Sequence, residues 1–156
     1  MDLEKASHSV YKIRYHVVLC VKYRRLLLKP EIRQAITEVF KEISERFDIY
    51  YHEVGFEDEH VHIHIMCGAS PKYAPSYIVM ITKSKSAIQI FKKFPELKKE
   101  LWGGSFWSAG KYIGTVGDGL NEEIIKNYIR NQEQSKEKIE SRMKQLTLFS
   151  FLNKKP

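Results

Sequence analysis

The segment Glu57-Asp58-Glu59-His60-Val61-His62-Ile63-His64-Ile65 decides the expected fold of this chain. Successive side chains of a β-strand point to opposite faces, so a strand here would project three histidines to one side and three aliphatic residues to the other. One apolar face and one imidazole face are typical of a central strand that packs against a core and presents metal ligands. The strand is expected over residues 60–67 and would end at Gly68.

The hydrophobic periodicity of the flanking sequence predicts the remaining elements. The expected strands cover residues 9–21, 48–55 and 107–116, and the expected helices cover 31–47, 75–93 and 122–145. The inner face of the second helix is expected to carry Ile78, Ile81, Ile88 and Phe91, and Asn121 is the expected cap of the last helix. The strands at 48–55 and 60–67 have a short connection and predict an antiparallel hairpin. Residues 95–106 show no clear pattern.

The order of these elements predicts the fold class. Strand, helix, strand, strand, helix, strand is a split βαβ pair, which indicates an α+β fold with a ferredoxin-like (RRM-like) antiparallel sheet. Its helices are expected on one face, with a C-terminal helix in addition. We expect one domain over residues 1–156, with a core over 8–134 and a tail at 146–156 that is flexible or packed on a partner.

The composition is that of a folded protein with a polyanionic partner. The chain has 156 residues, of which 43% are hydrophobic and 29% charged, and its net charge is +7. The longest apolar runs, such as residues 17–21, are too short to span a membrane, and the N-terminus has no apolar signal core, so a cytoplasmic location is expected. Cys20 and Cys67 do not form a CxxC pair, which argues against a zinc ribbon or a disulfide scaffold.

Basic residues interleave with an aromatic residue after the first expected strand. The run Lys22-Tyr23-Arg24-Arg25 suits a surface that binds single-stranded nucleic acid, where phosphates contact cations and bases stack on rings. The alternative is a solvated strand end.

The histidine strand has two interpretations as well. The imidazoles could form a polar face or hydrogen-bond within a core, or they could hold a metal ion, since neutral imidazole is a common transition-metal ligand. A further ligand would have to come from elsewhere. Tyr128 and Gln132 lie four residues apart on one helix face, and an amide oxygen with two imidazoles would suit Mg²⁺ or Mn²⁺. From the residues alone, the favoured interpretation of Tyr128 is an aromatic residue of the helix that packs on the sheet.

Four segments in order resemble the single-tyrosine HUH transposases of small bacterial and archaeal insertion sequences, the IS200-like type. The resemblance runs from about residue 9 to 134. It is carried by Lys22–Arg25, by His60-Val61-His62, by Phe106–Gly117 and by Tyr128–Gln132.

The resemblance implies a metal site and a nucleophile. His60, His62 and Gln132 would hold a divalent metal, Mg²⁺ or Mn²⁺, and Tyr128 would attack the DNA. His64 departs from the family pattern, which usually has an aliphatic residue there, and no role is assigned to it.

The implied activity is cleavage and rejoining of single-stranded DNA at element ends through a covalent 5′-phosphotyrosine. The implied substrate carries hairpins at its ends, and one tyrosine per subunit implies a homodimer. Arg14, Lys22, Arg24 and Arg25 are expected to contact the DNA.

Several alternatives stay open at this point. Within the same class they are a domesticated relative that cleaves repeat hairpins and a replication-type nickase. Outside it they are a non-catalytic nucleic-acid-binding module on an RRM-like sheet, and a structural or metal-storage protein. The binding module would bind independently of Tyr128, and metal storage would leave Tyr128 and Gln132 without roles.

Overall fold

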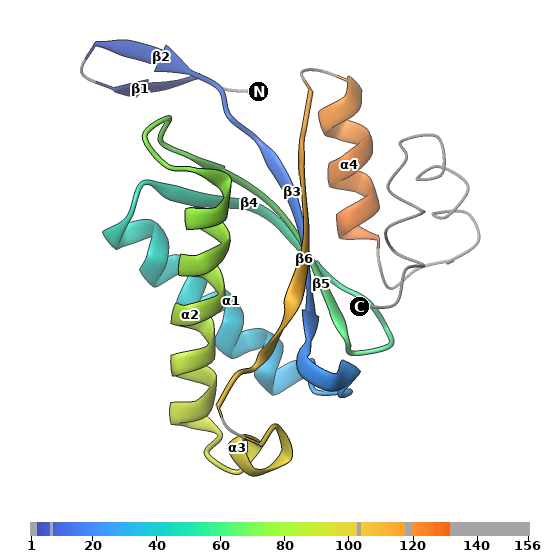
Figure 1. Ribbon diagram of the computed structural model, residues 1–156. Helices are drawn as coiled ribbons and strands as arrows, with labels where there is room; N and C mark the ends of the chain where they lie inside the picture. Colours follow the sequence, from blue (N-terminus) through green and yellow to red (C-terminus); the bar gives the residue numbers. More distant parts are fainter. Residues whose placement is uncertain (1–2, 7, 103, 118–119, 132–156) are drawn as a thin grey trace.

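A four-stranded antiparallel sheet forms the centre of the structure, a computed structural model that describes residues 3–6, 8–102, 104–117 and 120–131 (Figure 1). The strands follow the spatial order β4–β5–β3–β6. Their bounds are β3 (Tyr15–Val21), β4 (Ile49–Phe56), β5 (His62–Ala69) and β6 (Trp107–Thr115). This order, with one helix after β3 and another after β5, is the ferredoxin-like arrangement, so the expected fold class is confirmed.

Two long helices cover one face of the sheet (Figure 1). α1 spans Pro30–Arg46 and α2 spans Pro75–Lys93, and each has a proline in its first turn. Proline suits a helix start because its fixed φ is already helical and its missing N–H would have no partner there. The buried face of α1 consists of apolar side chains at helical spacing: Ile32, Ala35, Ile36, Val39, Phe40 and Ile43.

The opposite face of the sheet carries α4, which spans Leu120–Arg130 (Figure 1). The side chains of α4 that pack with Met66 of β5 are Ile125, Tyr128 and Ile129. Gly55 of β4 permits a close approach of this helix, because a Cβ there would overlap the carbonyl oxygen of Ile129 and lie 2.8 Å from its carbonyl carbon. Strand alternation thus separates an apolar core under α1 and α2 from a histidine-bearing face under α4.

Short elements lie at the margins of this architecture. They are the β1–β2 hairpin (Glu4–Ala6 and Ser9–Tyr11), the 3₁₀ helix η1 (Lys22–Arg24) and α3 (Leu97–Glu100). The strand expected over 9–21 is therefore divided into β2 and β3, and the unassigned residues 95–106 contain α3. No helix among the described residues has the length and apolar character needed to cross a membrane.

The histidine strand begins two residues later than expected. β5 starts at His62, whereas His60 lies in the preceding turn with a left-handed φ of 62°. The Glu57 amide donates to the His62 carbonyl oxygen and the His60 amide donates to the Glu57 carbonyl oxygen, which closes a tight reversal between β4 and β5. The prediction that three histidines share one strand face is therefore wrong, because the reversal takes His60 out of the pleat.

The inner face of α2 also differs from the prediction. Ile88 is 59% exposed, while Thr82 and Ser86 are buried. The Thr82 and Tyr51 hydroxyl groups share a hydrogen bond of 2.8 Å. The Trp107 indole N–H donates to the Ser86 hydroxyl oxygen at 2.8 Å. The other three expected residues, Ile78, Ile81 and Phe91, are buried, so the prediction of the inner face is wrong at Ile88 alone.

The last helix begins at Leu120, so Asn121 lies inside its first turn and is not its cap. The expected continuation of this helix to residue 145, Gln132 and the tail at 146–156 lie outside the described residues.

Candidate active site

His62 and His64 converge on one carboxylate. Both project from the same face of β5, since they are two residues apart in a strand. His62 Nδ1 lies 2.7 Å from one Glu57 carboxylate oxygen, and His64 Nε2 lies 3.0 Å from the other. Glu57 itself comes from the reversal that joins β4 to β5. The antiparallel hairpin therefore brings two imidazoles and a carboxylate together.

His16 supports this group from the neighbouring strand. Its Nε2 lies 3.2 Å from His64 Nδ1, and the two rings stack with centroids 5.4 Å apart. An N–H on His16 Nε2 can donate to His64, and His64 then carries its own proton on Nε2, toward Glu57. In the described part of the chain, His16 Nδ1 has no hydrogen-bond partner. This chain of contacts fixes the ring orientation of His64.

Tyr128 completes the group from the α4 side. Its ring meets the His64 ring edge to face, with centroids 5.4 Å apart, and the His16 ring at 6.3 Å. The side chain is buried between α4 and β5. A phenol, two imidazoles and a carboxylate therefore gather on one face of the sheet.

The environment shifts the pKa values of these groups in different directions. Burial lowers the pKa of His16 and of His64, which favours their neutral forms. Burial also lowers the pKa of His62, but hydrogen bonds with Cys20 and Glu57 outweigh it and raise that pKa to about 9. Burial of Glu57 opposes its ionisation, yet hydrogen bonds from His62 and His64 hold its pKa well below the usual range.

The donor atoms at this point fit a divalent cation. One ligand atom each from Glu57, Glu59 and His62 lie within 4.8 Å of one another. His64 Nε2 reaches the same Glu57 carboxylate. Mixed imidazole and carboxylate donors suit borderline divalent ions such as Mn²⁺.

His60 lies apart from this group. Its Nδ1 is 3.0 Å from the Leu28 carbonyl oxygen and 3.0 Å from an Arg33 guanidinium nitrogen. Of the residues expected to form the site, His62 joins this group through Glu57 and Tyr128 joins it through His64, whereas His60 has other partners. Their catalytic and metal-binding roles stay predictions.

Sequence reasoning missed the contributions of His16 and Glu57 and assigned no role to His64. His16 had a signal, because it lies at an inward position of the first strand among apolar neighbours. Glu57 belongs to the acidic run before the histidines, but only the hairpin geometry shows that Glu57 contacts both His62 and His64 and that Glu59 also lies in the donor cluster.

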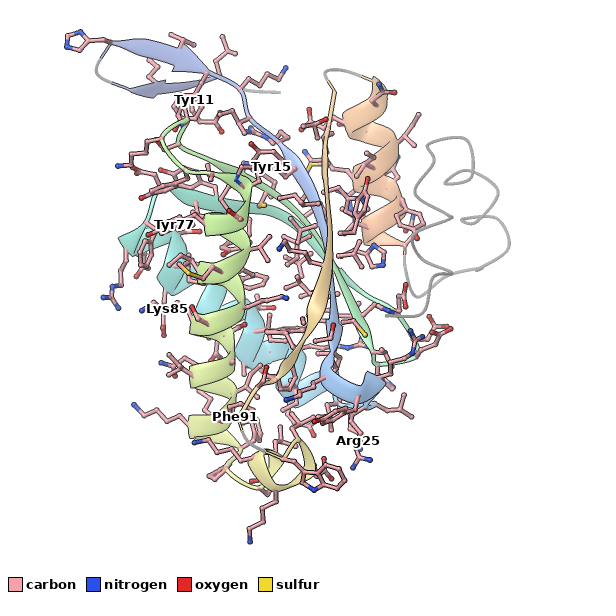
Figure 2. The ribbon with its side chains drawn as sticks, in the orientation of Figure 1. Tyr11, Tyr15, Arg25, Tyr77, Lys85 and Phe91 are labelled. Carbon is pink, nitrogen blue, oxygen red and sulfur yellow. The ribbon has the colours of Figure 1, made fainter. Side chains whose placement is uncertain are left out.

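The expected DNA contacts differ in accessibility. Arg14 is buried, its guanidinium lies 2.9 Å from a Glu4 carboxylate oxygen, and it donates to the Ile13 carbonyl oxygen. This burial and the ion pair with Glu4 argue against Arg14 as a DNA contact, and its expected role stays a prediction. Lys22 is half-buried and its amine lies 5.1 Å from the Tyr23 ring centroid, whereas Arg24 is exposed. Arg25 is exposed as well (Figure 2).

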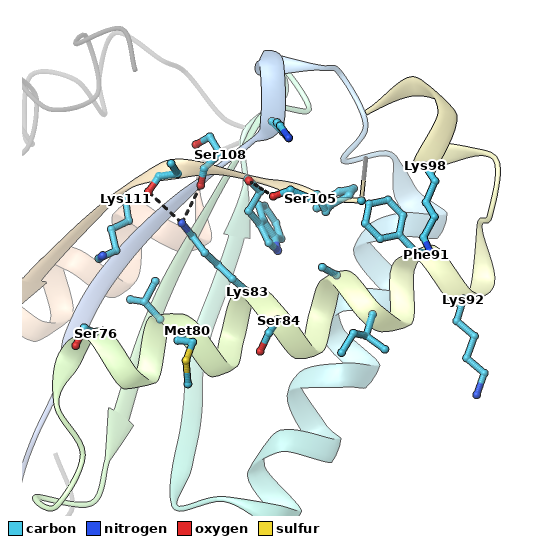
Figure 3. A pocket seen from close by; sticks show the side chains of 18 residues that line it. Ser76, Met80, Lys83, Ser84, Phe91, Lys92, Lys98, Ser105, Ser108 and Lys111 are labelled. Carbon is cyan, nitrogen blue, oxygen red and sulfur yellow. Dashed lines mark hydrogen bonds between the residues drawn. The ribbon is translucent and has the colours of Figure 1, made fainter. Parts of the chain in front are cut away.

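A basic groove of about 1080 Å³ lies between α2 and β6 (Figure 3). The Lys83 side chain crosses the groove from α2, and its amine donates to the Ser108 carbonyl oxygen at 2.8 Å (Figure 3). The lysines that line it are Lys22, Lys83, Lys92, Lys98 and Lys111. Its lining contains none of the site histidines, so the groove is a separate feature from the histidine group.

The sequence matches the family described as IS200-like transposases over residues 9–132. It is 30% identical over 132 residues to the ISDra2 transposase TnpA of Deinococcus radiodurans, an alignment that covers 85% of this chain and 92% of that protein. It is also 30% identical over 131 residues to the transposase for insertion sequence element IS200 of Salmonella typhimurium, with 84% of each chain covered.

Solved structures share the fold. A crystal structure of a transposase-type protein from Deinococcus radiodurans R1 superposes with a TM-score of 0.65 at 27% identity, over 85% of this chain and 99% of that one. A REP-associated tyrosine transposase bound to a REP hairpin superposes with a TM-score of 0.56 at 9% identity, over 81% and 69% of the chains. With its sequence matched from the first strand to the tyrosine helix, this chain belongs to the IS200-like transposase family.

Proposed function

We propose that this protein cleaves and rejoins single-stranded DNA, with Tyr128 as the nucleophile and a divalent metal, Mg²⁺ or Mn²⁺, as cofactor. The observation that carries the proposal is the packing of the Tyr128 ring against His64, beside the carboxylate on which His62 and His64 converge.

The geometry favours His62 and His64 as the histidine pair of the metal site. The family resemblance implies His60 and His62 as the pair. His60, however, lies before β5, and its ring hydrogen-bonds with Leu28 and Arg33. Two strand residues at i and i+2 can chelate one ion. In the metal-bound form His64 would offer Nε2 to the metal and would carry its proton on Nδ1, toward His16 Nε2. Glu57 would be a third ligand or would orient the histidines, and the role of Gln132 rests on the resemblance alone.

Each group has a defined part in the chemistry. The Tyr128 oxygen would attack phosphorus, the bond from phosphorus to the 3′-oxygen would break, and the phenolic proton would leave to a base or to water. The departing 3′-oxygen would take up a proton, which leaves a 5′-phosphotyrosine and a free 3′-hydroxyl. A bound metal would polarise the phosphate and stabilise negative charge. His16, through His64, would keep the ligand ring in place.

The substrate and assembly are proposed from the family. The REP-associated relative is bound to a hairpin, and we propose a single strand with hairpins at its ends as the substrate here. Lys22, Arg24 and Arg25 would contact phosphates, and two active tyrosines would come from a homodimer. A base-stacking module on the sheet surface is disfavoured, because α4 covers the histidine face and α1 and α2 cover the other.

A covalent-adduct assay tests the proposal. The protein is incubated with labelled single strands from the flanks of its own gene, with Mn²⁺ or Mg²⁺ and with chelator, and a denaturation-resistant complex is sought on a gel. We expect a metal-dependent adduct that Tyr128→Phe abolishes. Tight binding without an adduct would reject the covalent mechanism.

The histidine assignment has its own comparison. His62→Ala and His64→Ala should abolish the adduct and weaken Mn²⁺ binding measured by calorimetry, while His60→Ala should retain metal binding. If a folded His60→Ala protein loses metal binding and His64→Ala does not, the metal ligands are His60 and His62, as the family resemblance implies.

A further inference from the structure

Two exposed aromatic side chains lie against each other at one end of the sheet. Trp102 is 80% exposed and Tyr23 is 56% exposed, and their rings meet edge to face with centroids 6.1 Å apart. They come from different parts of the chain, η1 and the turn after α3 (Figure 1). Tryptophan and tyrosine gain much of their stabilising effect from burial, so an exposed pair in contact indicates a surface that binds something.

The backbone holds both side chains in an uncommon conformation. Tyr23, Arg24 and Trp102 have left-handed φ values of 59°, 53° and 41°, and they are three of the four non-glycine residues with positive φ in the described chain. Bulky residues rarely adopt this region because of steric cost, and strained residues cluster at functional sites. The concentration of such residues at one exposed aromatic pair supports a role in binding.

Positive charge surrounds the pair. The Lys22 amine lies 5.1 Å from the Tyr23 ring centroid, and Arg24 and Arg25 are exposed on the adjoining residues. Lys22 also lines the basic groove between α2 and β6, so this lysine belongs both to the groove and to the surroundings of the aromatic pair. Flat apolar rings bordered by cations complement unpaired bases bordered by phosphates.

Tyr23 lies a few residues after the part of β3 that pairs with the histidine strand β5. Cys20 of β3 pairs with His62 of β5, and the Val21 amide donates to the Val61 carbonyl oxygen. Tyr23 follows three residues after Cys20, a chain distance of at most about 11 Å. A nucleic-acid strand that leaves the histidine group at this end of the sheet would therefore meet Tyr23.

We propose that Tyr23 and Trp102 form a stacking site for unpaired nucleobases of single-stranded DNA, with Lys22, Arg24 and Arg25 on the adjacent phosphates. This inference rests on the proposed function and names a contact outside the site of cleavage. Stacking accepts any base, so the site holds the strand without reading its sequence.

Fluorescence anisotropy with a labelled thymidine oligonucleotide tests the site. Tyr23→Ala and Trp102→Ala should each weaken binding about 10-fold to 100-fold, and Trp102→Phe should retain most of the affinity. Binding of a fully paired duplex should not change. Leu26→Ala is the matched control, because Leu26 is 59% exposed on the same segment but has no ring.

A second measurement separates stacking from charge. Arg24→Gln should reduce the salt dependence of binding by about one phosphate contact, whereas Trp102→Ala should leave that slope unchanged. Tryptophan fluorescence should be quenched by the oligonucleotide in the wild type and much less in Trp102→Phe, since the other tryptophan, Trp107, is buried.

The outcomes distinguish this site from the proposed reaction. If the adduct forms but both alanine variants bind the oligonucleotide as tightly as the wild type, the stacking site is refuted and the reaction stands. If no adduct forms while the variants lose single-strand binding, the reaction fails and the stacking site stands. Variants that change only self-association in sedimentation would make the pair a protein contact and would overturn the proposal.

Discussion

Gly55→Ala should displace the tyrosine helix from the sheet. A Cβ at Gly55 would overlap the Ile129 carbonyl oxygen and lie 2.8 Å from its carbonyl carbon. Carbon atoms in ordinary contact are about 3.5–4.0 Å apart, and the carbonyl oxygen overlaps the Cβ more closely than the carbon does, so α4 would have to retreat by at least about 1 Å. Tyr128 precedes Ile129 by one residue and would move with it, away from the His64 ring.

The magnitude follows from the cost of overpacking. Insertion of a methyl group into a packed contact costs about 1–3 kcal/mol. For a chain of this length, each kcal/mol lowers Tm by about 2–4 °C, so Gly55→Ala should lower Tm by roughly 2–12 °C. A displacement of about 1 Å in a reacting group can reduce a rate on the order of 100-fold, and we expect a loss of that size in adduct formation.

Gly110→Ala provides the control for this prediction. A Cβ at Gly110 has no neighbour within 4 Å, so the substitution should leave Tm unchanged or raise it slightly by restricting the unfolded chain. Differential scanning fluorimetry and the adduct rate are measured on both variants. If Gly55→Ala matches the wild type in both measurements, α4 does not pack on β4 as described, and the placement of Tyr128 beside His64 is refuted.

Three further predictions concern the core and the site. Burial raises the pKa of the Cys67 thiol to about 12, so iodoacetamide should label Cys67 only after unfolding, and rapid labelling of the native protein would contradict its burial. Ile36→Ala should cost about 2–5 kcal/mol in urea unfolding because Ile36 is fully buried, whereas Ile88→Ala should change stability by less than about 0.5 kcal/mol. His16→Phe should weaken Mn²⁺ binding by about 10-fold to 100-fold because it removes the hydrogen bond to His64. His16→Gln, which can still hydrogen-bond, should keep part of the lost affinity. If His16→Phe binds Mn²⁺ as tightly as the wild type, His16 does not support the metal site.

Much of the secondary structure follows from the sequence alone. The helix expected over residues 75–93 is α2, and the helix expected over 31–47 begins and ends one residue earlier as α1. These segments combine a proline at the start with apolar residues at helical spacing, and both signals act within a few residues. The order of strands and helices then leaves the ferredoxin-like sheet as the expected topology, which the structure confirms.

The errors arise where distant contacts override local pattern. Alternation along residues 60–64 suggested one strand face, but pairing with β3 and the reversal from β4 start the strand at His62. Arg14 has the local pattern of a basic strand residue, yet the β1–β2 hairpin brings the half-buried Glu4 to the buried Arg14 guanidinium. The hairpin of β4 and β5 was expected from the sequence, but the residue at which β5 begins and the β1–β2 hairpin were not.

The sequence by itself determined which residue types are available: the histidines, the helix tyrosine and the basic-aromatic run. Tertiary structure decided which of them meet. Strand register and the packing of α4 on the sheet bring one group of side chains into contact, namely His16, Glu57, His62, His64 and Tyr128. The fold also brings Trp102 into contact with Tyr23. Periodicity is a property of neighbouring residues, whereas convergence of side chains depends on contacts between residues far apart in the chain, which local pattern does not encode.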